Sequence, residues 1–340
     1  MKSKIVALLL AVALLLGGCR SRVLSPTVSP TNSPSPAISR AANVTATAAP
    51  KVPDLPKKLQ ANGAQTKLKI YDIKTKKISE LPVEEYLCGV LAGEMRKDWP
   101  AEALKAQAII ARTFLIDFLS ENEVSAVSKD ADISTDPKES QAYDVSGIDD
   151  AIRKAVKETS GQVIVYDGKF IKAWFHSSSG GKTADAVEGL HYKDGNLPYI
   201  VSVDSDESQT PKEFTEWTNT FTTDEITAAL HTMNIDVGDT IESVKIGQTG
   251  SSGRATTLTI NDKEVSAPEF RLAMDPTKFR STWLTEVKFD GKKLTVSGKG
   301  FGHGVGMSQW GAFQMASSGA NAQDIIQHYF KDVQIASLWK

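Results

Sequence analysis

The spacing of apolar residues between positions 100 and 119 predicts a long amphipathic helix. Its apolar side chains recur at every third or fourth position, as one face of a helix requires; they are Leu104, Ala108, Ala111, Leu115 and Leu119. Pro100 stands at the expected start, where its fixed φ angle and missing N–H suit a first helical turn. The segments 83–95 and 148–159 predict helices before and after this one.

Shorter apolar runs predict β-strands and complete a mixed pattern. A first strand is suggested near Leu68, and further strands at 163–166, 170–175, 283–289 and 293–297. The last two flank Asp290-Gly291, which favours a hairpin turn. Ser266 and Glu269 have the spacing of a helical capping box, and the tail from Met307 reads as helical. Because helices and strands alternate irregularly, we expect the α+β class.

The first 63 residues differ in composition from the rest. Residues 1–19 join two lysines to a short apolar run ending in Leu-Gly-Gly-Cys19, the pattern of a lipoprotein signal peptide with a lipobox. A plain secretory leader is the alternative. Residues 20–63 are rich in Ser, Thr, Pro and Ala, which bury too little apolar area to offset the entropy of ordering. We therefore predict a disordered linker at 20–63 and a single irregular mixed helix/sheet domain at 64–340.

Charge and cysteine content narrow the environment and the partners. A net charge of -2 over 340 residues gives no reason to expect a nucleic-acid partner. Lipidation of Cys19 would anchor the chain to the extracytoplasmic face of the cell membrane. Cys88 is then the one remaining cysteine, so we expect no intrachain disulfide. Its neighbours are apolar, and we interpret Cys88 as a buried small hydrophobe.

Glu94 is the strongest catalytic candidate in the sequence. It lies in the otherwise apolar segment 89–95, at the end of a predicted helix, where desolvation would raise its pKa toward the value that a general acid needs. The alternative is a solvent-facing glutamate at a fraying helix end. Lys105 and Arg112 lie two helical turns apart, where they could bind substrate oxygens or form a solvated stripe.

Two further segments carry histidines. In segment 174–183, His176 ends a predicted strand and precedes a Ser/Gly turn, which suits a polar cleft rim or a surface turn. This segment lacks the first glycine of a P-loop. Segment 298–311 has glycine at nearly every second position, so its backbone can approach a ligand closely, and it carries His303 and Gln309. It contains no G-x-G-x-x-G, which disfavours a dinucleotide site. We therefore expect His176, His303 and Gln309 to bind substrate.

Metal and cofactor signals are lacking in the sequence. The 5 histidines are scattered, and no C-x-x-C or H-x-x-x-H pattern occurs. The chain also has no G-x-S-x-G elbow of a serine hydrolase, although sequence alone leaves a Ser-His-Asp site open. We expect no metal and no cofactor.

These segments, in this order, resemble the stage II sporulation protein D family (SpoIID/LytB domain) from about residue 63 to the end. The matching stretches are 82–86 through Glu94-Met95, 102–107 through 111–113, 175–183, Pro198-Tyr199, Phe270-Arg271 and the Gly-rich segment around His303. The resemblance implies a lytic transglycosylase that cleaves peptidoglycan glycan strands, especially strands stripped of stem peptides, in wall remodelling such as sporulation. It implies that Glu94 is catalytic, and it carries substrate binding over to Lys105, Arg112 and Tyr199.

The sequence departs from the family pattern in two places. Some members bind zinc through Cys and His in the loop after the second helix, but residues 132–143 contain neither, so no structural zinc is expected. Val201 stands where the family usually has a lysine.

Two other functions compete with the enzyme. The LytB branch of the family keeps open a non-catalytic glycan-binding module that activates or recruits an N-acetylmuramoyl-L-alanine amidase. A purely structural wall lipoprotein would leave the Gly/His segment unexplained. One outstanding glutamate suits a lytic transglycosylase, because a hydrolytic glycosidase normally needs two carboxylates.

Overall fold

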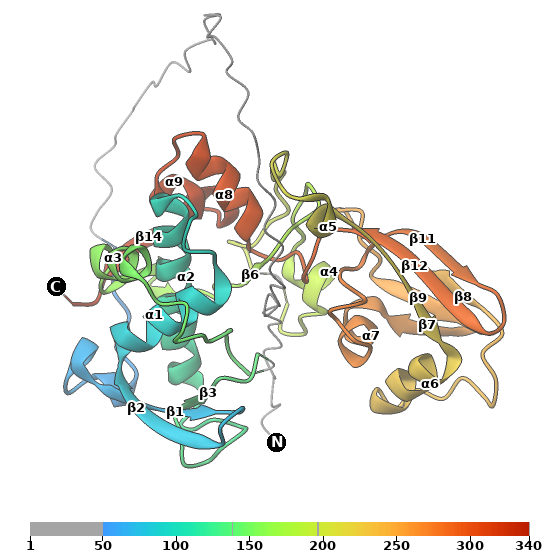
Figure 1. The fold of residues 1–340 in the computed structure, drawn as a ribbon, viewed down its shortest axis with the longest axis horizontal. Helices are drawn as coiled ribbons and strands as arrows, with labels where there is room; N and C mark the ends of the chain where they lie inside the picture. Colours follow the sequence, from blue (N-terminus) through green and yellow to red (C-terminus); the bar gives the residue numbers. More distant parts are fainter. Residues whose placement is uncertain (1–49, 138, 196, 340) are drawn as a thin grey trace, which may run out of the picture.

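The computed structural model describes residues 50–339, except Lys138 and Asn196 (Figure 1). The predicted signal peptide with Cys19 and the linker up to residue 49 lie outside the described residues. The described chain has two apolar cores, and we call the parts around them the first lobe and the second lobe. The second lobe comprises residues 212–299, so the chain leaves the first lobe and later returns to it.

The first lobe is built around one buried helix, α2 (Ala101–Glu121). The other helices of this lobe are α1 (Val83–Glu94), α3 (Asp150–Glu158), α4 (Ala186–Leu190), α8 (Gln309–Ser317) and α9 (Ala322–Tyr329). Of these, α1, α3, α8 and α9 pack on α2. Nearly the whole stretch from Ala103 to Ile116 is buried, which a helix surrounded by other elements requires.

Three small sheets complete the first lobe. Strands β2 (Lys77–Pro82), β1 (Lys67–Asp72) and β3 (Ile133–Ser134) form one, and β14 (Gln334–Ser337), β4 (Gln162–Tyr166) and β5 (Lys169–Phe170) form another. In the third, β6 (Phe175–His176) pairs in parallel with β13 (Met307–Ser308), and His176 is in register with Ser308. This pairing brings the His176 segment beside the start of α8.

The second lobe contains two three-stranded sheets. One has the order β11 (Trp283–Phe289), β12 (Lys293–Lys299), β7 (Glu216–Thr222), and the other β10 (Lys263–Ser266), β9 (Thr257–Ile260), β8 (Val244–Ile246). Its helices are α5 (Lys212–Thr215), α6 (Thr223–Thr232) and α7 (Ala267–Ala273). Figure 1 shows α5 at the junction between this lobe and the α8 end of the first lobe.

The structure confirms the α+β class and the three predicted central helices. The hairpin at Asp290-Gly291 is also confirmed, with Gly291 at φ 91° and the Asp290 carboxylate accepting from two following backbone N–H groups. The predicted strand at 170–175 is wrong, because residues 171–174 belong to no strand. The C-terminal tail ends in β14, which sequence reasoning missed.

Two boundary expectations need correction. The predicted linker ran to residue 63, but the short 3-10 helices η1 (Lys57–Leu59) and η2 (Gly63–Gln65) precede β1, and Leu59 is fully buried in the first core. The capping box at Ser266 forms only half: the Ser266 hydroxyl accepts from the Glu269 N–H at 3.4 Å. The Glu269 carboxylate instead pairs with His191 and Lys193, both at 3.2 Å.

Within the described ranges, no helix has the length and apolarity to span a membrane.

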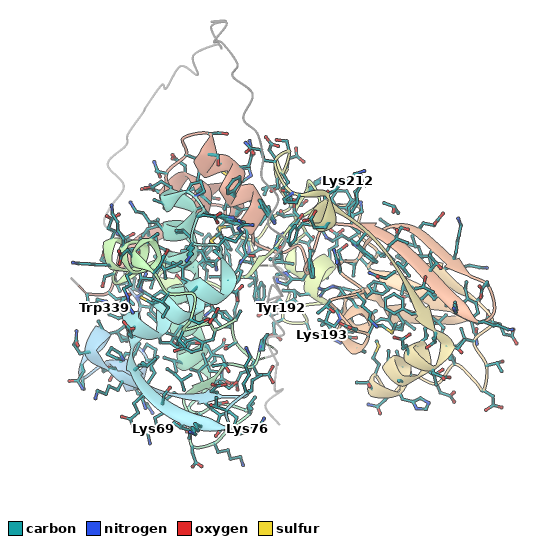
Figure 2. The ribbon with its side chains drawn as sticks, in the orientation of Figure 1. Lys69, Lys76, Tyr192, Lys193, Lys212 and Trp339 are labelled. Atoms are coloured by element: carbon teal, nitrogen blue, oxygen red, sulfur yellow. The ribbon has the colours of Figure 1, made fainter. Side chains whose placement is uncertain are left out.

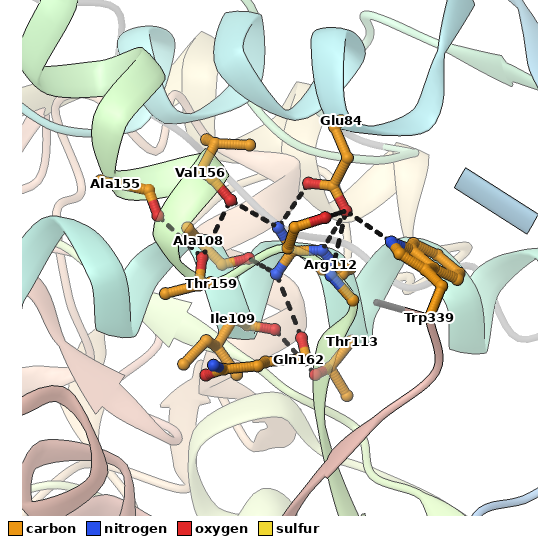
Figure 3. Close-up of polar contacts among 12 residues, drawn as sticks. Glu84, Ala108, Ile109, Arg112, Thr113, Ala155, Val156, Thr159, Gln162 and Trp339 are labelled. Carbon is orange, nitrogen blue, oxygen red and sulfur yellow. Dashed lines mark hydrogen bonds and ion pairs between the residues drawn. The ribbon is translucent and has the colours of Figure 1, made fainter. Parts of the chain in front are cut away.

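A buried ion pair joins the start of α1 to α2 and α3 (Figure 3). Arg112 is 0% exposed and binds Glu84 through two bonds, of 3.0 and 2.6 Å. Its guanidinium also donates to the carbonyl oxygens of Gln162 and Val156, at 3.1 and 3.4 Å. The Glu84 carboxylate further accepts from the Trp339 indole N–H at 3.1 Å. These contacts connect α1, α2, α3 and the end of the described chain around the buried guanidinium of Arg112.

We predict that Glu84→Ala lowers the free energy of unfolding by about 3 kcal/mol, because it leaves the buried Arg112 guanidinium without a counter-charge. Glu85→Ala is the matched control, since Glu85 makes an exposed pair with Arg153 and surface pairs contribute little. Urea denaturation of both variants measures the difference. Equal destabilisation by the two changes would contradict a buried pair that organises this lobe.

Candidate active site

Glu94 occupies the last position of α1, where the helix meets α2 and α8. Its side chain is partly buried, and burial is the main reason that its pKa is raised from 4.5 to about 7. The carbonyl groups at the C-terminal end of α1 carry partial negative charge, which acts in the same direction. Glu94 is therefore a carboxyl that exchanges a proton near neutral pH.

Two glycines on α1 allow the loop at 141–144 to approach Glu94. A Cβ on Gly93 would lie 2.7 Å from the backbone nitrogen of Tyr143, and one on Gly89 would lie 2.3 Å from the Tyr143 ring. The loop backbone is held there by a bond from the Asp144 N–H to the Gly89 carbonyl, at 2.9 Å. Because both positions lack a side chain, the Ala142 N–H can donate to Glu94 Oε1 at 2.7 Å.

Gln309 contacts the other oxygen of the Glu94 carboxyl. Its amide Nε2 lies 3.3 Å from Glu94 Oε2 and 3.4 Å from Oε1 of Gln107, which is fully buried on α2. Both hydrogen bonds to Glu94 favour the charged form and lower its pKa, against the larger effect of burial. The site thus combines side chains from α1, α2 and α8 with one loop N–H.

Glu207 fixes the segments around Gln309, and sequence reasoning missed it. It is 8% exposed and accepts from Ser178, Ser179, Gly180, Ser205 and Ser308 at 2.5–3.3 Å. The Ser308 hydroxyl in turn caps α8 by accepting from the Gly311 N–H at 3.2 Å. One buried carboxylate therefore orders the Ser/Gly turn and the helix start that positions Gln309.

An aromatic cluster lies beside Gln309. The ring centroids of Trp99 and Trp310 are 4.7 Å apart, and Phe313 packs on both, at 5.2 and 5.4 Å. Phe214 of α5 lies 5.6 Å from Trp310, so the cluster continues into the second lobe. Trp99, Phe313 and Phe214 are each half-buried and leave part of their rings accessible.

His176 and His303 are brought together but are buried. They are 3% and 4% exposed, and their ring centroids are 5.6 Å apart. His176 Nδ1 donates to the Val305 carbonyl at 3.1 Å, and His303 Nδ1 accepts from the Val305 N–H at 3.0 Å. Burial lowers the pKa of His303 to about 3 and that of His176 well below 6.5, so both rings are neutral. Their contacts hold the Gly-rich segment against β6.

Hydrogen bonds of two further buried charged residues, Arg254 and Glu188, join the lobes, and the sequence did not reveal them. Arg254 of the second lobe is 1% exposed and donates to the carbonyls of Ser179 and Lys182, at 2.7 and 2.8 Å. Glu188 of α4 accepts from the Ser252 hydroxyl at 2.6 Å and from the Arg254 backbone N–H at 3.3 Å. These bonds connect the Ser/Gly turn of the first lobe to the loop before β9.

Three predicted substrate-binding residues make their contacts elsewhere. Lys105 pairs with Glu102 and Glu158, at 2.9 and 2.7 Å, and lies about 200° around α2 from Gln107. Arg112 binds Glu84, ten residues before Glu94 on α1, or about 15 Å along the helix.

Tyr199 is also away from the Glu94 contacts. It is 7% exposed, and its hydroxyl accepts from the Lys172 N–H at 3.0 Å. Roles of these three residues in substrate binding stay predictions.

Cys88 is 5% exposed, and burial raises the pKa of its thiol to about 11, which confirms it as a buried hydrophobe. In the described part of the chain, no group of three or more His, Cys, Asp or Glu side chains could hold a metal ion; the expected absence of zinc stays a prediction.

Comparison with known proteins identifies the family. The family described as stage II sporulation protein matches residues 71–166, which hold Glu94 and Gln107. Stage II sporulation protein D of Bacillus amyloliquefaciens is 32% identical over 82% of this chain and 83% of its own. The chain belongs to the stage II sporulation protein D family. The protein of the same name from Bacillus subtilis is 31% identical over 78% of either chain.

Two further matches extend across the second lobe. A domain of unknown function, DUF8618, matches residues 183–306, from the Ser/Gly turn to the Gly-rich segment. The amidase enhancer of Bacillus subtilis is 28% identical over 74% of this chain, and the aligned part spans 40% of that longer protein. The alignment with stage II sporulation protein D of Bacillus amyloliquefaciens covers 82% of this chain, which is more than the residues outside the second lobe, so that similarity includes both lobes.

We predict that Glu94→Gln stabilises the protein more at pH 8 than at pH 5. A carboxyl with a raised folded-state pKa binds its proton more tightly when folded, so its ionisation costs stability as the pH rises from about 4.5 to about 7. The pH-dependent difference should be on the order of 1–3 kcal/mol, since one pKa unit corresponds to about 1.4 kcal/mol. Urea denaturation at both pH values measures it, and an equal effect at the two would argue against a raised pKa.

Proposed function

We propose that the protein is a lytic transglycosylase that cleaves the MurNAc–GlcNAc bonds of peptidoglycan glycan strands, with Glu94 as its acid and base. Membership of the stage II sporulation protein D family supports a role at the cell wall. The observation that carries the reaction is the Glu94 carboxyl, whose pKa of about 7 allows both protonated and ionised forms near neutral pH.

A single carboxyl of this kind can complete the reaction. Protonated Glu94 donates its proton to the glycosidic oxygen, and the bond from C1 of the muramoyl residue to that oxygen breaks. The 6-hydroxyl of the same muramoyl residue attacks C1, and the Glu94 carboxylate takes the hydroxyl proton. The product carries a 1,6-anhydro ring, no water is consumed, and the carboxyl is restored. The Ala142 N–H and the Gln309 amide stabilise the carboxylate in between.

Two carboxylates in segments that contact the Glu94 site are fully engaged in hydrogen bonds, which favours this reaction over hydrolysis. A hydrolytic glycosidase needs a second carboxylate that can serve as base or nucleophile. Glu207 accepts six hydrogen bonds. Glu139, in the loop after β3, is bonded to the Ser125 hydroxyl and to the backbone N–H groups of Ala126 and Ser134. Neither carboxylate has the freedom to activate a water.

The setting of this reaction follows from the N-terminal pattern. Lipidation of Cys19 would hold the protein at the extracytoplasmic face of the cell membrane, and the Ser/Thr/Pro/Ala-rich residues between Cys19 and the first lobe would let the lobes reach the wall. The substrate is strands already stripped of stem peptides, and the process is wall remodelling such as sporulation. Membrane release of a Cys19→Ala variant tests the anchor.

A second function, stimulation of an amidase, is favoured by the match to the amidase enhancer. It requires glycan binding but no proton transfer. A Glu94→Gln protein that stimulates an N-acetylmuramoyl-L-alanine amidase as well as the wild type would support this function as a separate one.

We predict that Glu94→Gln abolishes strand cleavage and leaves glycan binding intact. Glutamine keeps the size of the side chain but cannot transfer a proton, and general acid–base catalysis is typically worth about 10²–10⁴-fold. Mass spectrometry of peptide-stripped strands after incubation should find 1,6-anhydro-MurNAc ends with the wild type alone. Reducing muramic ends would indicate hydrolysis, and absence of any cleavage by the wild type would overturn the proposal.

We predict that Gln309→Leu lowers turnover and moves the alkaline limb of the pH–rate profile upward. The Gln309 amide favours the ionised form of Glu94, so its loss raises the pKa of that carboxyl. Gln323→Leu, on the exposed side of α9, is the control and should leave the profile unchanged. An alkaline limb at the wild-type pH in Gln309→Leu would show that the amide does not act on Glu94.

A further inference from the structure

A polar pocket of about 440 Å³ lies on the second lobe, outside the Glu94 site. Its walls come from α5 and from the outer face of the β11-β12-β7 sheet. The lining side chains that matter here are Lys212, Glu216, Thr218, Thr285, Ser297 and Lys299. The volume is within the usual range of small-ligand sites and could hold about one or two sugar rings.

Strand register explains why this wall is polar. Glu216 is opposite Lys299, and Thr218 is opposite Ser297, so these four side chains share one face of the sheet. The hydroxyls of Thr218 and Ser297 are 2.9 Å apart. Lysine, glutamate and hydroxyl groups together can donate and accept hydrogen bonds, as a hydroxylated, N-acetylated sugar with a carboxylate requires.

Two backbone features shape the pocket floor. The register of β11 against β12 shifts between Leu284 and Glu286, so Thr285 is the extra residue of a β-bulge that directs its side chain into the pocket wall. Gly298 has no room for a side chain, because a Cβ there would lie 2.5 Å from the Trp217 ring. The bulge bends the sheet at the pocket, and the missing side chain of Gly298 lets Trp217 pack against the opposite, buried face of β12.

Two series of residues link the pocket walls to the Glu94 site. Phe214 follows the pocket residue Glu213 in α5, and its ring contacts Trp310, which follows Gln309. The next residue, Thr215, accepts a hydrogen bond at its carbonyl from the Gly300 N–H at 3.0 Å. The pocket residues Gly298 and Lys299 begin the Gly-rich segment 298–311, which carries Gln309. Figure 2 shows Lys212 on the side of the second lobe that faces the first.

We propose that this pocket is a distal subsite that binds a muramoyl residue of the glycan strand, several sugars away from the bond cleaved at Glu94. Lys212 and Lys299 bind the lactyl carboxylate of that residue, and the aromatic cluster around Trp310 supports the strand in between. Lys212 is exposed, and its distance of 3.7 Å to Glu216 leaves its ammonium available to a ligand. The subsite rests on the proposed function for the identity of its ligand.

The test compares strand binding by charge-reversed variants in the Glu94→Gln background, which should hold a strand without cutting it. Lys212→Glu/Lys299→Glu should bind peptide-stripped strands of several disaccharides roughly tenfold more weakly, because two attractions become repulsions. Lys293→Glu is the matched control: it lies on the same strand and face as Lys299 but at the far end of β12. Its affinity should equal that of the parent.

An uncharged chitin oligomer of equal length separates charge recognition from damage to the fold. It has no lactyl carboxylate, so its affinity should be nearly the same for the double variant and for the control. Unchanged affinity of the double variant for murein strands would overturn the subsite, and so would an equal loss with both ligands. If the wild type cleaves no strand, the proposed function fails, whereas the binding comparison still decides the subsite.

Discussion

The close approach of one loop to the end of α1 is the constraint on which the candidate site depends. Gly89 and Gly93 remove the side chains that would hold residues 141–144 away, and the Ala142 N–H then reaches the Glu94 carboxyl. The same approach buries that carboxyl. Burial raises its pKa, while the bonds from Ala142 and Gln309 lower it by less, and the balance is close to 7. An exposed glutamate at this helix end would titrate near 4.5 and could not serve as an acid at neutral pH.

Three buried or partly buried carboxylates have different roles because their surroundings differ. Glu84 neutralises a buried guanidinium, and Glu207 accepts enough hydrogen bonds to act as a structural anchor. Glu94 has two hydrogen-bond donors and no cation within bonding distance in the described structure. The structural contacts of Glu207 and Arg254 nevertheless affect the geometry of the Glu94 site. Glu207 orders the start of α8, and the Arg254 contacts hold the second lobe against the same Ser/Gly turn, so the position of Gln309 is determined from both lobes.

Local patterns in the sequence were enough to predict the helices around Glu94 and the hairpin at Asp290, because side-chain periodicity and turn chemistry act over a few residues. Glu94 and Gln309 could be selected as candidates for the same reason. The partner of Arg112 could not be predicted in this way, because the carboxylate that it binds, Glu84, is 28 residues away. The two-turn spacing of Lys105 and Arg112 suggested a shared substrate-binding face, but the two residues form separate ion pairs. Long-range contacts also explain why Glu207 was missed. The second lobe was not separated from the first, because its sheets pair strands that are far apart in the sequence, such as β7 with β12.

The histidines show how a motif can mislead about its role. His176 and His303 stand in the two most distinctive segments, yet both are buried, neutral and bonded to the backbone of Val305. Catalysis by this site therefore depends on the pKa of Glu94, which can be measured by carbon NMR of ¹³C-labelled glutamate carboxyls, assigned by comparison with Glu94→Gln. We expect one carboxyl signal that titrates near pH 7 and is missing from the variant. A Glu94 signal that titrates near 4.5 would contradict it.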